Sequence, residues 1–348
     1  MSKIFNEITT VVAVTLMLAA VSACGEKEFY NDEQYRKECY IVSGENNIFG
    51  QEYTYGENAT GYLSIYLSGS TPTDEPVTVT LRQADHYLKD YNQSVNGTSY
   101  ENYIELLPTN CYQVESWNAV VTADNSYTLF PIMVNIDNLN PDKKYFLPLE
   151  IASVSNYQYS GTKSYVLFQI YMKNAYATTK TDTYYQMTGN TLDLLAEGDV
   201  WEESSPGSSP TAFNATKKMT PLSENSVRIL PGTQQSTETA FVTQRSIRLT
   251  ITDEIYQNPV IGDDGLPTGK TYPVNIVKVE PLNEGSGCVQ VRQAYDGTDQ
   301  ESGNLLYSYF NPEDKKFTLN YCYRMPSDKS GSKDTWHKVK EIMERLDY

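Results

Sequence analysis

Gly61-Tyr62-Leu63-Ser64-Ile65-Tyr66-Leu67 is the stretch from which the fold class of this chain can be inferred. Its three aliphatic residues alternate with two tyrosines and a serine. Because successive side chains of a β-strand point to opposite faces, the aliphatic set would face a core and the other set would face outward. The stretch therefore predicts a half-buried β-strand.

Similar short runs lie on both sides of this strand. Val77–Leu81 alternates in the same way and follows a proline-bearing turn at 71–76, which indicates two consecutive antiparallel strands. Asp85–Asn92 is expected to form a helical turn with Asp85 as its cap. In all, about seven or eight short strands before residue 172 predict a β-sandwich.

The second half contains further strand candidates separated by turn-rich segments. Ile247–Ile251 alternates apolar and polar residues, and Asn258-Pro259 and Asp263-Asp264-Gly265 punctuate a hairpin-like connection to Tyr272–Val277. Residues 202–215 are rich in Ser, Pro and Gly and are expected to be a long surface loop. The whole chain is therefore predicted to be all-β.

Leu18-Ala19-Ala20-Val21-Ser22-Ala23-Cys24 resembles a lipobox, the site at which a bacterial signal peptide is cut and the new N-terminal cysteine is acylated. The apolar run Val11–Val21 suits a signal peptide and is too short to span a bilayer. We predict a lipoprotein signal peptide at 1–23 and lipidation of Cys24, with more than one acyl chain to hold the membrane. The alternative is an ordinary secretory signal with a chance cysteine.

Residues 24–37 are expected to form an acidic tether. Gly25-Glu26-Lys27-Glu28 resembles the signal that sends Bacteroidetes lipoproteins to the outer face of the outer membrane, and Asp32-Glu33 adds charge. We therefore predict a lipid-anchored outer-membrane protein that faces the cell exterior. The alternative is a solvated tether without a sorting role, since acidic segments poor in apolar residues stay disordered.

The chain is strongly acidic, with a formal net charge of −17 over 348 residues. It should repel nucleic acid and anionic lipid head groups, so we expect no nucleic-acid partner and no membrane contact beyond the lipid. Tyrosine is abundant, with 29 Tyr against 10 Phe and 3 Trp. Tyrosine suits half-buried strands, and it also supplies rigid, amphipathic area at binding surfaces.

The cysteines after Cys24 allow disulfides, because an envelope location permits their oxidation. If bridges form, we expect Cys39 to pair with Cys111 and Cys288 to pair with Cys322, one bridge in each half. The alternative is free cysteines, which are common in protein cores.

The sequence lacks the residue patterns of common enzyme sites. His86 and His337 are far apart and have no partner at ligand spacing, which argues against a zinc site or a Ser-His-Asp triad. Asp253-Glu254 and Asp263-Asp264 are adjacent pairs, whereas a glycosidase needs two carboxylates that face one sugar bond. Neither Asp263-Asp264 nor Asp296-Gly297-Thr298-Asp299 lies in an EF-hand pattern. We predict no enzymatic activity, no metal and no cofactor.

Trp201 and Trp336 are the candidate ligand-binding residues. Trp201 precedes the Ser/Pro/Gly-rich segment and Trp336 follows residues 330–334, and binding residues concentrate at loops. An exposed indole offers a flat apolar partner, with one donor, for the C–H face of a sugar. The alternative for both is core or edge packing, and Trp117, within a turn, is the weakest candidate.

Three short segments carry a resemblance to a known family: Tyr91-Asn92, Tyr103–Pro108 and Tyr145–Ile151. In this order they resemble the N-terminal domain of Bacteroidetes surface lipoproteins known as domain of unknown function 1735, over roughly residues 35–175. The resemblance implies an immunoglobulin-like sandwich that precedes varied partners, including glycosidase and glycan-binding modules. It brings no established catalytic residues.

The second half, through Phe317–Arg324 and the tail, resembles the companion domain of unknown function 4361, an antiparallel, calycin-like β-barrel module. The tail is ambiguous, because its apolar residues Val339, Ile342, Met343 and Leu346 fall on one helical stripe. The resemblance instead implies a closing strand, which we favour.

The predicted organisation is a signal peptide (1–23), a tether (24–37), an immunoglobulin-like β-sandwich (38–177), a linker (178–183) and a β-barrel-like domain (184–348). The predicted function is non-catalytic binding of an oligo- or polysaccharide in support of polysaccharide utilisation, alongside an importer of the starch-utilisation type. We expect weak binding by the second half. The alternatives are a structural or adhesin-like surface lipoprotein without a glycan ligand, and a hydrolase with scattered carboxylates.

Overall fold

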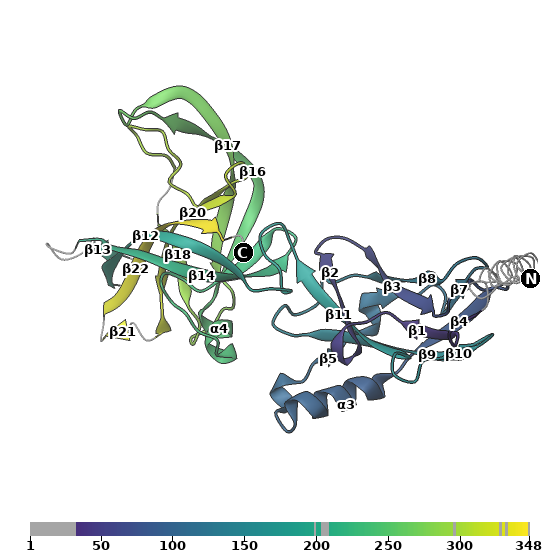
Figure 1. Ribbon diagram of the computed structural model, residues 1–348. Coiled ribbons are helices and arrows are strands. Elements are labelled where there is room, and N and C mark those ends of the chain that lie inside the picture. Colours follow the sequence, from purple (N-terminus) through teal and green to yellow (C-terminus); the bar gives the residue numbers. More distant parts are fainter. Residues whose placement is uncertain are drawn as a thin grey trace, which may run out of the picture. The chain divides into compact units, whose positions relative to one another are not determined.

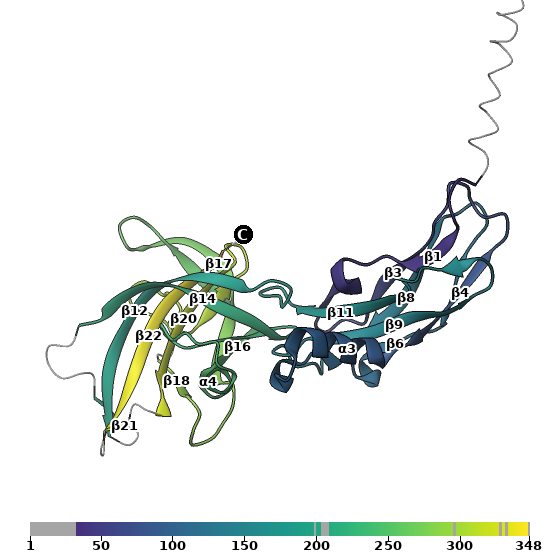
Figure 2. The same ribbon diagram turned by 60° about the horizontal axis from the view of Figure 1, so that its bottom comes forward.

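The computed structural model describes residues 33–197, 200–202, 209–294, 297–326, 329–330 and 333–346. These residues form two compact units, which are both rich in strands (Figures 1 and 2). The first unit comprises the residues through Gln51, Thr60–Val134 and Tyr145–Ile170, and the second comprises Glu52–Ala59, Asn135–Lys144 and Tyr171–Tyr348. The predicted signal peptide and Cys24 lie outside the described residues, and the predicted boundaries at 178–183 stay a prediction.

The first unit is built on two sheets. The five-stranded sheet has the order β10-β1-β3-β8-β6 and consists of β1 (Glu38–Ile41), β3 (Ala59–Leu67), β6 (Tyr112–Gln113), β8 (Tyr127–Val134) and β10 (Gln158–Tyr159). The other sheet has the order β2-β11-β9-β4-β7, with β5 beside β9, and consists of β2 (Ile48–Thr54), β4 (Val77–Gln83), β5 (Glu105–Leu106), β7 (Asn118–Val121), β9 (Tyr145–Val154) and β11 (Tyr165–Lys173). The predicted β-sandwich is therefore confirmed.

The core of this sandwich lies where the alternation in β3 predicts it. Leu63 and Ile65 are fully buried, whereas Tyr62 is 48% exposed on the opposite face of the strand. Val77 and Val79 of β4 supply buried aliphatic side chains from the other sheet. The burial of alternate residues in both sheets is the main stabilising contribution to such a fold.

The helix after β4 is longer than the turn expected from the sequence, and Asp85 is not its cap. It is α3 (Asp85–Asn96), its N-cap position is Ala84, and it ends at Gly97 with a positive φ of 54°. The Asp85 carboxylate instead accepts a hydrogen bond from Gln83 Nε2 at 2.7 Å. Short 3-10 helices lie at η1 (Glu45–Asn47), η2 (Tyr100–Asn102) and η3 (Thr109–Cys111).

The second unit contains an antiparallel barrel. Its strands follow the order β12-β14-β15-β16-β17-β19-β20-β22, and β22 pairs again with β12 to close the ring. The strands are β12 (Thr183–Glu197), β14 (Thr211–Ser223), β15 (Ser226–Ile229), β16 (Ile247–Ile261), β17 (Pro267–Pro281), β19 (Tyr309–Asn311), β20 (Lys316–Arg324) and β22 (Lys333–Arg345). Short additions are β13 (Val200–Glu202), α4 (Thr239–Arg245), β18 (Gln290–Gln293) and β21 (Lys329–Ser330). The barrel-like prediction is confirmed.

Two local expectations for this half need revision. The segment expected to be loop through residue 215 ends in strand, because β14 begins at Thr211 and pairs with β12. The hairpin around Asp263-Asp264-Gly265 is confirmed but is longer than expected, since β16 and β17 contain 15 residues each. Gly265 has a positive φ of 82°, which the turn requires and glycine adopts without strain.

The tail is a strand, as the resemblance implied. In β22, Val339 and Met343 are buried in the barrel, whereas Ile342 is 47% exposed. The helical stripe would have buried Ile342 beside Met343. The strand period holds because β22 is paired on both sides, with β12 and with β20.

The disulfide pairings that we expected if bridges form are not seen; Cys39, Cys111, Cys288 and Cys322 are all free, which was the alternative. Cys39 lies on β1 and Cys111 adjoins β6, and three strand spacings of about 4.8 Å separate these strands. This separation exceeds the roughly 4–7 Å between the Cα atoms of bridged cysteines. In the second unit, Cys322 pairs in register with Arg292 of β18, and Cys288 lies before that strand begins.

Gly189 lies where β12 and β22 close the barrel, opposite Glu341. A Cβ atom at Gly189 would lie 2.1 Å from the carbonyl oxygen of Lys340 and 2.8 Å from Cα of Glu341. Both contacts are with backbone, so a side chain there would push the two closing strands apart. The close approach of these strands therefore requires glycine.

Gly189→Ala should destabilise the second unit by at least about 1–3 kcal/mol, since overpacking against backbone forces strands to shift. The measurement is the free energy of unfolding of that unit in urea. Gly287→Ala is the matched control, because nothing lies within 4 Å of a Cβ built at Gly287. Equal losses in the two variants would contradict the closure argument.

Candidate ligand-binding site

A cavity of about 430 Å³ lies beside β12 and β14 of the barrel. It is lined by Tyr184 from β12, Thr216–Lys218 from β14, and Leu230 and Gln234–Thr237 from the segment that follows β15. We call it the barrel cavity. Its volume falls within the roughly 300–1,000 Å³ of small-molecule sites, which are often found at the mouths of β-barrels.

The segment that forms one wall of the barrel cavity is held to the barrel from inside. The backbone N–H of Gly232 donates a 2.8 Å hydrogen bond to the buried Tyr321 hydroxyl. Gly232 has a φ of 52°, and a Cβ there would lie 2.7 Å from the hydroxyl of Tyr323. Gln235 Nε2 also donates to the carbonyl oxygen of Thr216 at 3.0 Å. The wall is therefore ordered before a ligand binds, which reduces the entropy cost of binding.

The lining of the barrel cavity combines uncharged hydrogen-bonding groups with an apolar surface. Gln234 and Gln235 bring amides, and Thr216, Ser236 and Thr237 bring hydroxyls, while Tyr184 and Leu230 bring apolar surface. Such a set can both donate to and accept from a neutral, hydroxyl-rich ligand. Tyr184 and Leu230 would contact the C–H groups of that ligand.

The exposed lysine of this lining already has an acidic partner. Lys218 Nζ lies 2.6 Å from Asp182 Oδ1, and the Tyr184 hydroxyl donates to Asp182 Oδ2 at 3.2 Å. The Asp182 carboxylate thus offsets the Lys218 charge and also fixes the position of the Tyr184 ring. The cavity rim therefore carries little net charge.

One residue of the lining, Lys217, belongs to a buried ion pair inside the barrel. Lys217 Nζ donates to both carboxylate oxygens of Glu341, at 3.0 and 2.9 Å, and the Tyr321 hydroxyl donates to Glu341 Oε1 at 3.1 Å. Lys217 is 4% exposed, and Glu341 and Tyr321 are fully buried. Each polar group therefore has a partner, which is the condition under which a buried charge is tolerated.

Burial changes the titration of two members of this network. It lowers the pKa of the Lys217 ammonium, and the Glu341 carboxylate opposes this shift. Burial, followed by the charge of Glu341, raises the pKa of Tyr321 well above its ordinary value. The tyrosine therefore stays neutral and able to donate its hydrogen bond to Glu341.

The two predicted site tryptophans lie on strands that flank the same part of β12. Trp336 of β22 pairs with Leu194, and Trp201 of β13 pairs with Ala196. Trp336 is 2% exposed and packs with Leu194 and Cys322, so its ring belongs to a small core and does not offer an open face. The side chain of Trp201 lies outside what the structure describes.

Trp336 also reaches the wall of a second cavity, of about 360 Å³, together with Pro281, Glu284, Gly285 and Val289–Arg292. The guanidinium carbons of Arg292 and Arg324 lie 4.7 and 5.2 Å from the centre of the indole. These cation–π contacts occupy the ring that a sugar would otherwise use. Trp336 thus supports the wall of this cavity more than it exposes a stacking surface.

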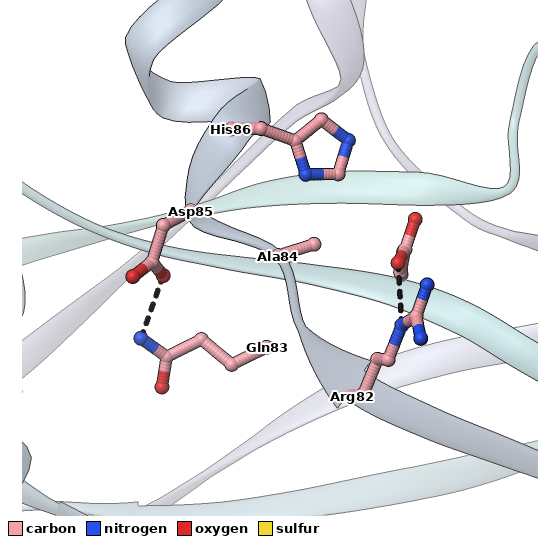
Figure 3. A pocket seen from close by; sticks show the side chains of 6 residues that line it. Arg82, Gln83, Ala84, Asp85 and His86 are labelled. Atoms are coloured by element: carbon pink, nitrogen blue, oxygen red, sulfur yellow. Dashed lines mark hydrogen bonds and ion pairs between the residues drawn. The ribbon is translucent and has the colours of Figure 1, made fainter.

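A third cavity, also of about 360 Å³, lies in the first unit at the start of α3 (Figure 3). Arg82 Nε lies 2.6 Å from Glu150 Oε1 across the β4–β9 pairing, and Gln83 bonds to Asp85. His86 lies beside these pairs in Figure 3. Arg82 and Glu150 are thus a cross-strand surface pair of the usual kind, and Asp85 is bonded locally to the neutral Gln83.

The other histidine and the aspartate turns have local structural roles. His337 Nδ1 lies 2.7 Å from Asp193 Oδ1 on the paired strands β22 and β12. Asp264 Oδ1 accepts from the backbone of Leu266, and Asp299 Oδ1 accepts from the backbone and hydroxyl of Ser302. Within the part of the chain that the structure describes, His, Cys, Asp and Glu side chains form no group placed to hold a metal ion, and no helix is long and apolar enough to cross a membrane.

Sequence reasoning missed the barrel cavity. Its residues come from three separate segments, none with a motif, and Gln234–Thr237 has the composition of an ordinary loop. The one available signal was Lys217, a lysine at an inward position between Ala215 and Met219 of a strand. When the alternation of a strand places a charged side chain on the core face, a buried residue of opposite charge is expected to pair with it. Here that residue is Glu341.

Lys217→Met and Glu341→Leu should each destabilise the second unit by roughly 3–5 kcal/mol, because each leaves an uncompensated buried charge. The double variant should lose less stability than the sum of the losses in the two single variants, since it removes both charges. A double-mutant cycle by urea unfolding measures the difference. The remaining loss should reflect the Tyr321 hydroxyl, whose acceptor is gone. Additive losses would show that the two charges do not depend on each other.

Comparisons with known proteins agree with this two-unit architecture. Residues 35–158 match a family model described as an N-terminal domain, and residues 164–344 match a model described as a C-terminal domain. No curated protein matches the chain. The second model alone spans more than half of the chain.

Solved structures to which this chain is similar include three proteins from Bacteroides. A protein of unknown function from Bacteroides ovatus is 13% identical, with 90% of this chain and 94% of that chain covered at a TM-score of 0.53. A multidomain protein from the same species that includes domain of unknown function 1735 is 11% identical, with 88% and 94% covered at a TM-score of 0.49. An auxiliary nutrient binding protein from Bacteroides thetaiotaomicron is 13% identical, with 87% and 92% covered at a TM-score of 0.44.

The first of these similarities shows a shared fold across both units, and the family models agree with it in sequence. The chain therefore belongs to the family of two-domain proteins that these N-terminal and C-terminal models describe.

Proposed function

We propose that this protein is a non-catalytic glycan-binding protein of the cell surface, and that the barrel cavity holds the glycan. The observation that carries the proposal is the lining of that cavity. Amides and hydroxyls gather there with a tyrosine ring and a leucine, on a wall fixed to the barrel from inside. Neutral sugars need these two kinds of contact: hydrogen bonds for their hydroxyls and apolar surface for their C–H faces.

The finer identity of the two units belongs to the same proposal. We infer that the first unit is a domain of unknown function 1735 and that the second is related to domain of unknown function 4361. The sequence segments quoted for the first and the closing strand of the second support this inference.

The setting of the protein rests on the sequence before the described residues. Cys24 is proposed as the lipid anchor, and the acidic residues after it as the signal for display on the outer face of the outer membrane. A glycan-binding lipoprotein there would concentrate polysaccharide for an importer of the starch-utilisation type. Binding is expected to be weak, because a partly open site gains little after desolvation and ordering.

Gln234→Ala and Tyr184→Ala should each weaken binding of an oligosaccharide by about five-fold or more, the usual effect of truncating an important contact. The measurement is calorimetry on the chain from residue 25 onward, after a glycan array has identified the oligosaccharide. Gln257→Ala is the matched control, because Gln257 is an exposed glutamine on β16 that does not line the cavity.

Arg292→Ala tests the cavity beside Trp336 in the same experiment. It removes a side chain from that cavity without truncating the buried indole. Loss of binding in Arg292→Ala alone would move the site to Trp336. An array on which the wild type binds no glycan would favour the structural or adhesin-like alternative.

Cys24→Ala should abolish membrane attachment, because acylation requires the thiol. The expected result is an unacylated precursor that no longer sediments with outer membranes, scored by metabolic labelling with a fatty-acid probe and by fractionation. Ser22→Ala keeps a small residue at its position and should leave labelling intact. Lipid labelling of the Cys24→Ala variant would refute the anchor.

A further inference from the structure

Three tyrosines form a ladder across neighbouring strands of the five-stranded sheet. Tyr40 of β1 and Tyr66 of β3 lie opposite each other in register, with ring centres 5.8 Å apart and planes at 29°. Tyr127 of β8 continues the row, with its ring centre 5.4 Å from that of Tyr66 and planes at 14°. Figure 2 shows β1, β3 and β8 side by side in this order.

The ladder belongs to a larger exposed surface on the outer face of this sheet. The exposed fractions are 49% for Tyr127, 48% for Tyr62, 47% for Leu129 and 37% for Val42. Their strand neighbours Leu63, Ile65 and Phe130 are buried, which places this set on the face away from the core. We call the tyrosine face the set Tyr40, Val42, Tyr62, Tyr66, Tyr127 and Leu129.

On the other sheet of the same sandwich, α3 covers part of the outer face. Leu88 of α3 packs on Phe146 and Leu167, and the ring of Tyr87 stacks on that of Tyr165 with centres 3.8 Å apart. A helix thus removes part of that outer face from water, while Tyr62 and Tyr127 of the tyrosine face stay about half exposed. Contiguous exposed apolar surface of this kind marks a site of interaction.

The charge of the tyrosine face restricts what can bind there. None of its six residues is charged. Glu38, the first residue of β1, forms a 3.1 Å ion pair with Arg36, which precedes the strand, so their charges cancel. The whole chain carries −17, so a second copy of it, nucleic acid or an anionic lipid surface would meet repulsion. A neutral ligand meets none.

The composition of the face favours a sugar over a protein of aliphatic character. Four of the six residues are tyrosines, each with an apolar ring for C–H groups and a hydroxyl that can donate or accept. Stacking within the ladder already orders the ring of Tyr127, whose outer side lies at the end of the row. A sugar ring that stacks there would therefore pay little additional ordering entropy.

We propose that the tyrosine face is a second glycan-binding surface, for a neutral polysaccharide chain, on the unit that does not contain the barrel cavity. The inference rests on the proposed function, since it assumes a glycan-binding protein. Two contacts on one polysaccharide would raise the apparent affinity above that of either site, because the second binding event becomes intramolecular.

The test is affinity electrophoresis of the chain from residue 25 onward in gels that contain a neutral β-glucan, a mannan or an arabinogalactan. A carboxymethylated β-glucan is the charged comparison. The variant is Tyr62→Thr/Tyr127→Thr, because threonine suits an exposed strand position and should preserve the fold. Tyr100→Thr is the matched control, since Tyr100 is 70% exposed in the same unit but lies outside the tyrosine face.

In a gel with one of the neutral polysaccharides, the double variant should be retarded at least five-fold less than the wild type. The retardation of Tyr100→Thr should equal that of the wild type. In calorimetry, the double variant should bind a short oligosaccharide as the wild type does. Equal retardation of the double variant and the wild type would overturn the inference and leave the barrel cavity unaffected. Loss in the double variant with no effect of Gln234→Ala would support the tyrosine face and contradict the cavity instead. Two further results would overturn the neutral-glycan assignment. One is retardation of the wild type by the carboxymethylated glucan and by none of the neutral polysaccharides. The other is a wild-type dimer in sedimentation that is lost in the double variant and kept in Tyr100→Thr.

Discussion

The pairing of β12 with β22 is the interaction on which the second unit depends. It joins the first strand of the barrel to the last and leaves the ring without an open edge between them. Gly189 permits the close approach of the two backbones, and Glu341, opposite it in register, receives the ammonium of Lys217 inside the barrel. At the point of closure, β12 therefore requires a residue without a side chain, Gly189, and β22 requires a cation to pair with its buried carboxylate, Glu341.

This closure also explains why the barrel cavity has a fixed shape. Glu341 holds Tyr321 through a hydrogen bond, and Tyr321 in turn accepts the backbone N–H of Gly232. The cavity wall that begins at Leu230 is thus linked, through two hydrogen bonds, to the carboxylate at the closing strand. A cavity supported in this way is preorganised, which matters most for a ligand that offers only weak individual contacts.

The sequence allowed most of the fold to be predicted and little of the site. The alternation of apolar and polar residues in 61–67 and in the strands of the second half indicates which side chains are buried. It does so because side chains of any single strand point to opposite faces in turn, whichever strands it pairs with. The barrel cavity depends on which strands pair, and no local pattern carries that information. Trp336 illustrates the difference: the sequence suggested a position beside a loop, whereas Trp336 lies within β22, where two arginines and Leu194 contact its ring. The question of disulfides, which the sequence left open, has the same cause, since strand order decides which cysteines meet.

The abundance of tyrosine, ambiguous in the sequence, is resolved by where the fold places individual rings. Tyr321 is fully buried and uses its hydroxyl as both donor and acceptor within the barrel, a role that phenylalanine could not fill. Tyr62 and Tyr127 are about half exposed on the outer face of the five-stranded sheet, and the ring of Tyr127 stacks on that of Tyr66. Stacking therefore uses one side of the Tyr127 ring and leaves about half of each side chain exposed. A ring that is apolar on its face and polar at its tip suits a ligand that combines both characters, such as the neutral polysaccharide proposed above.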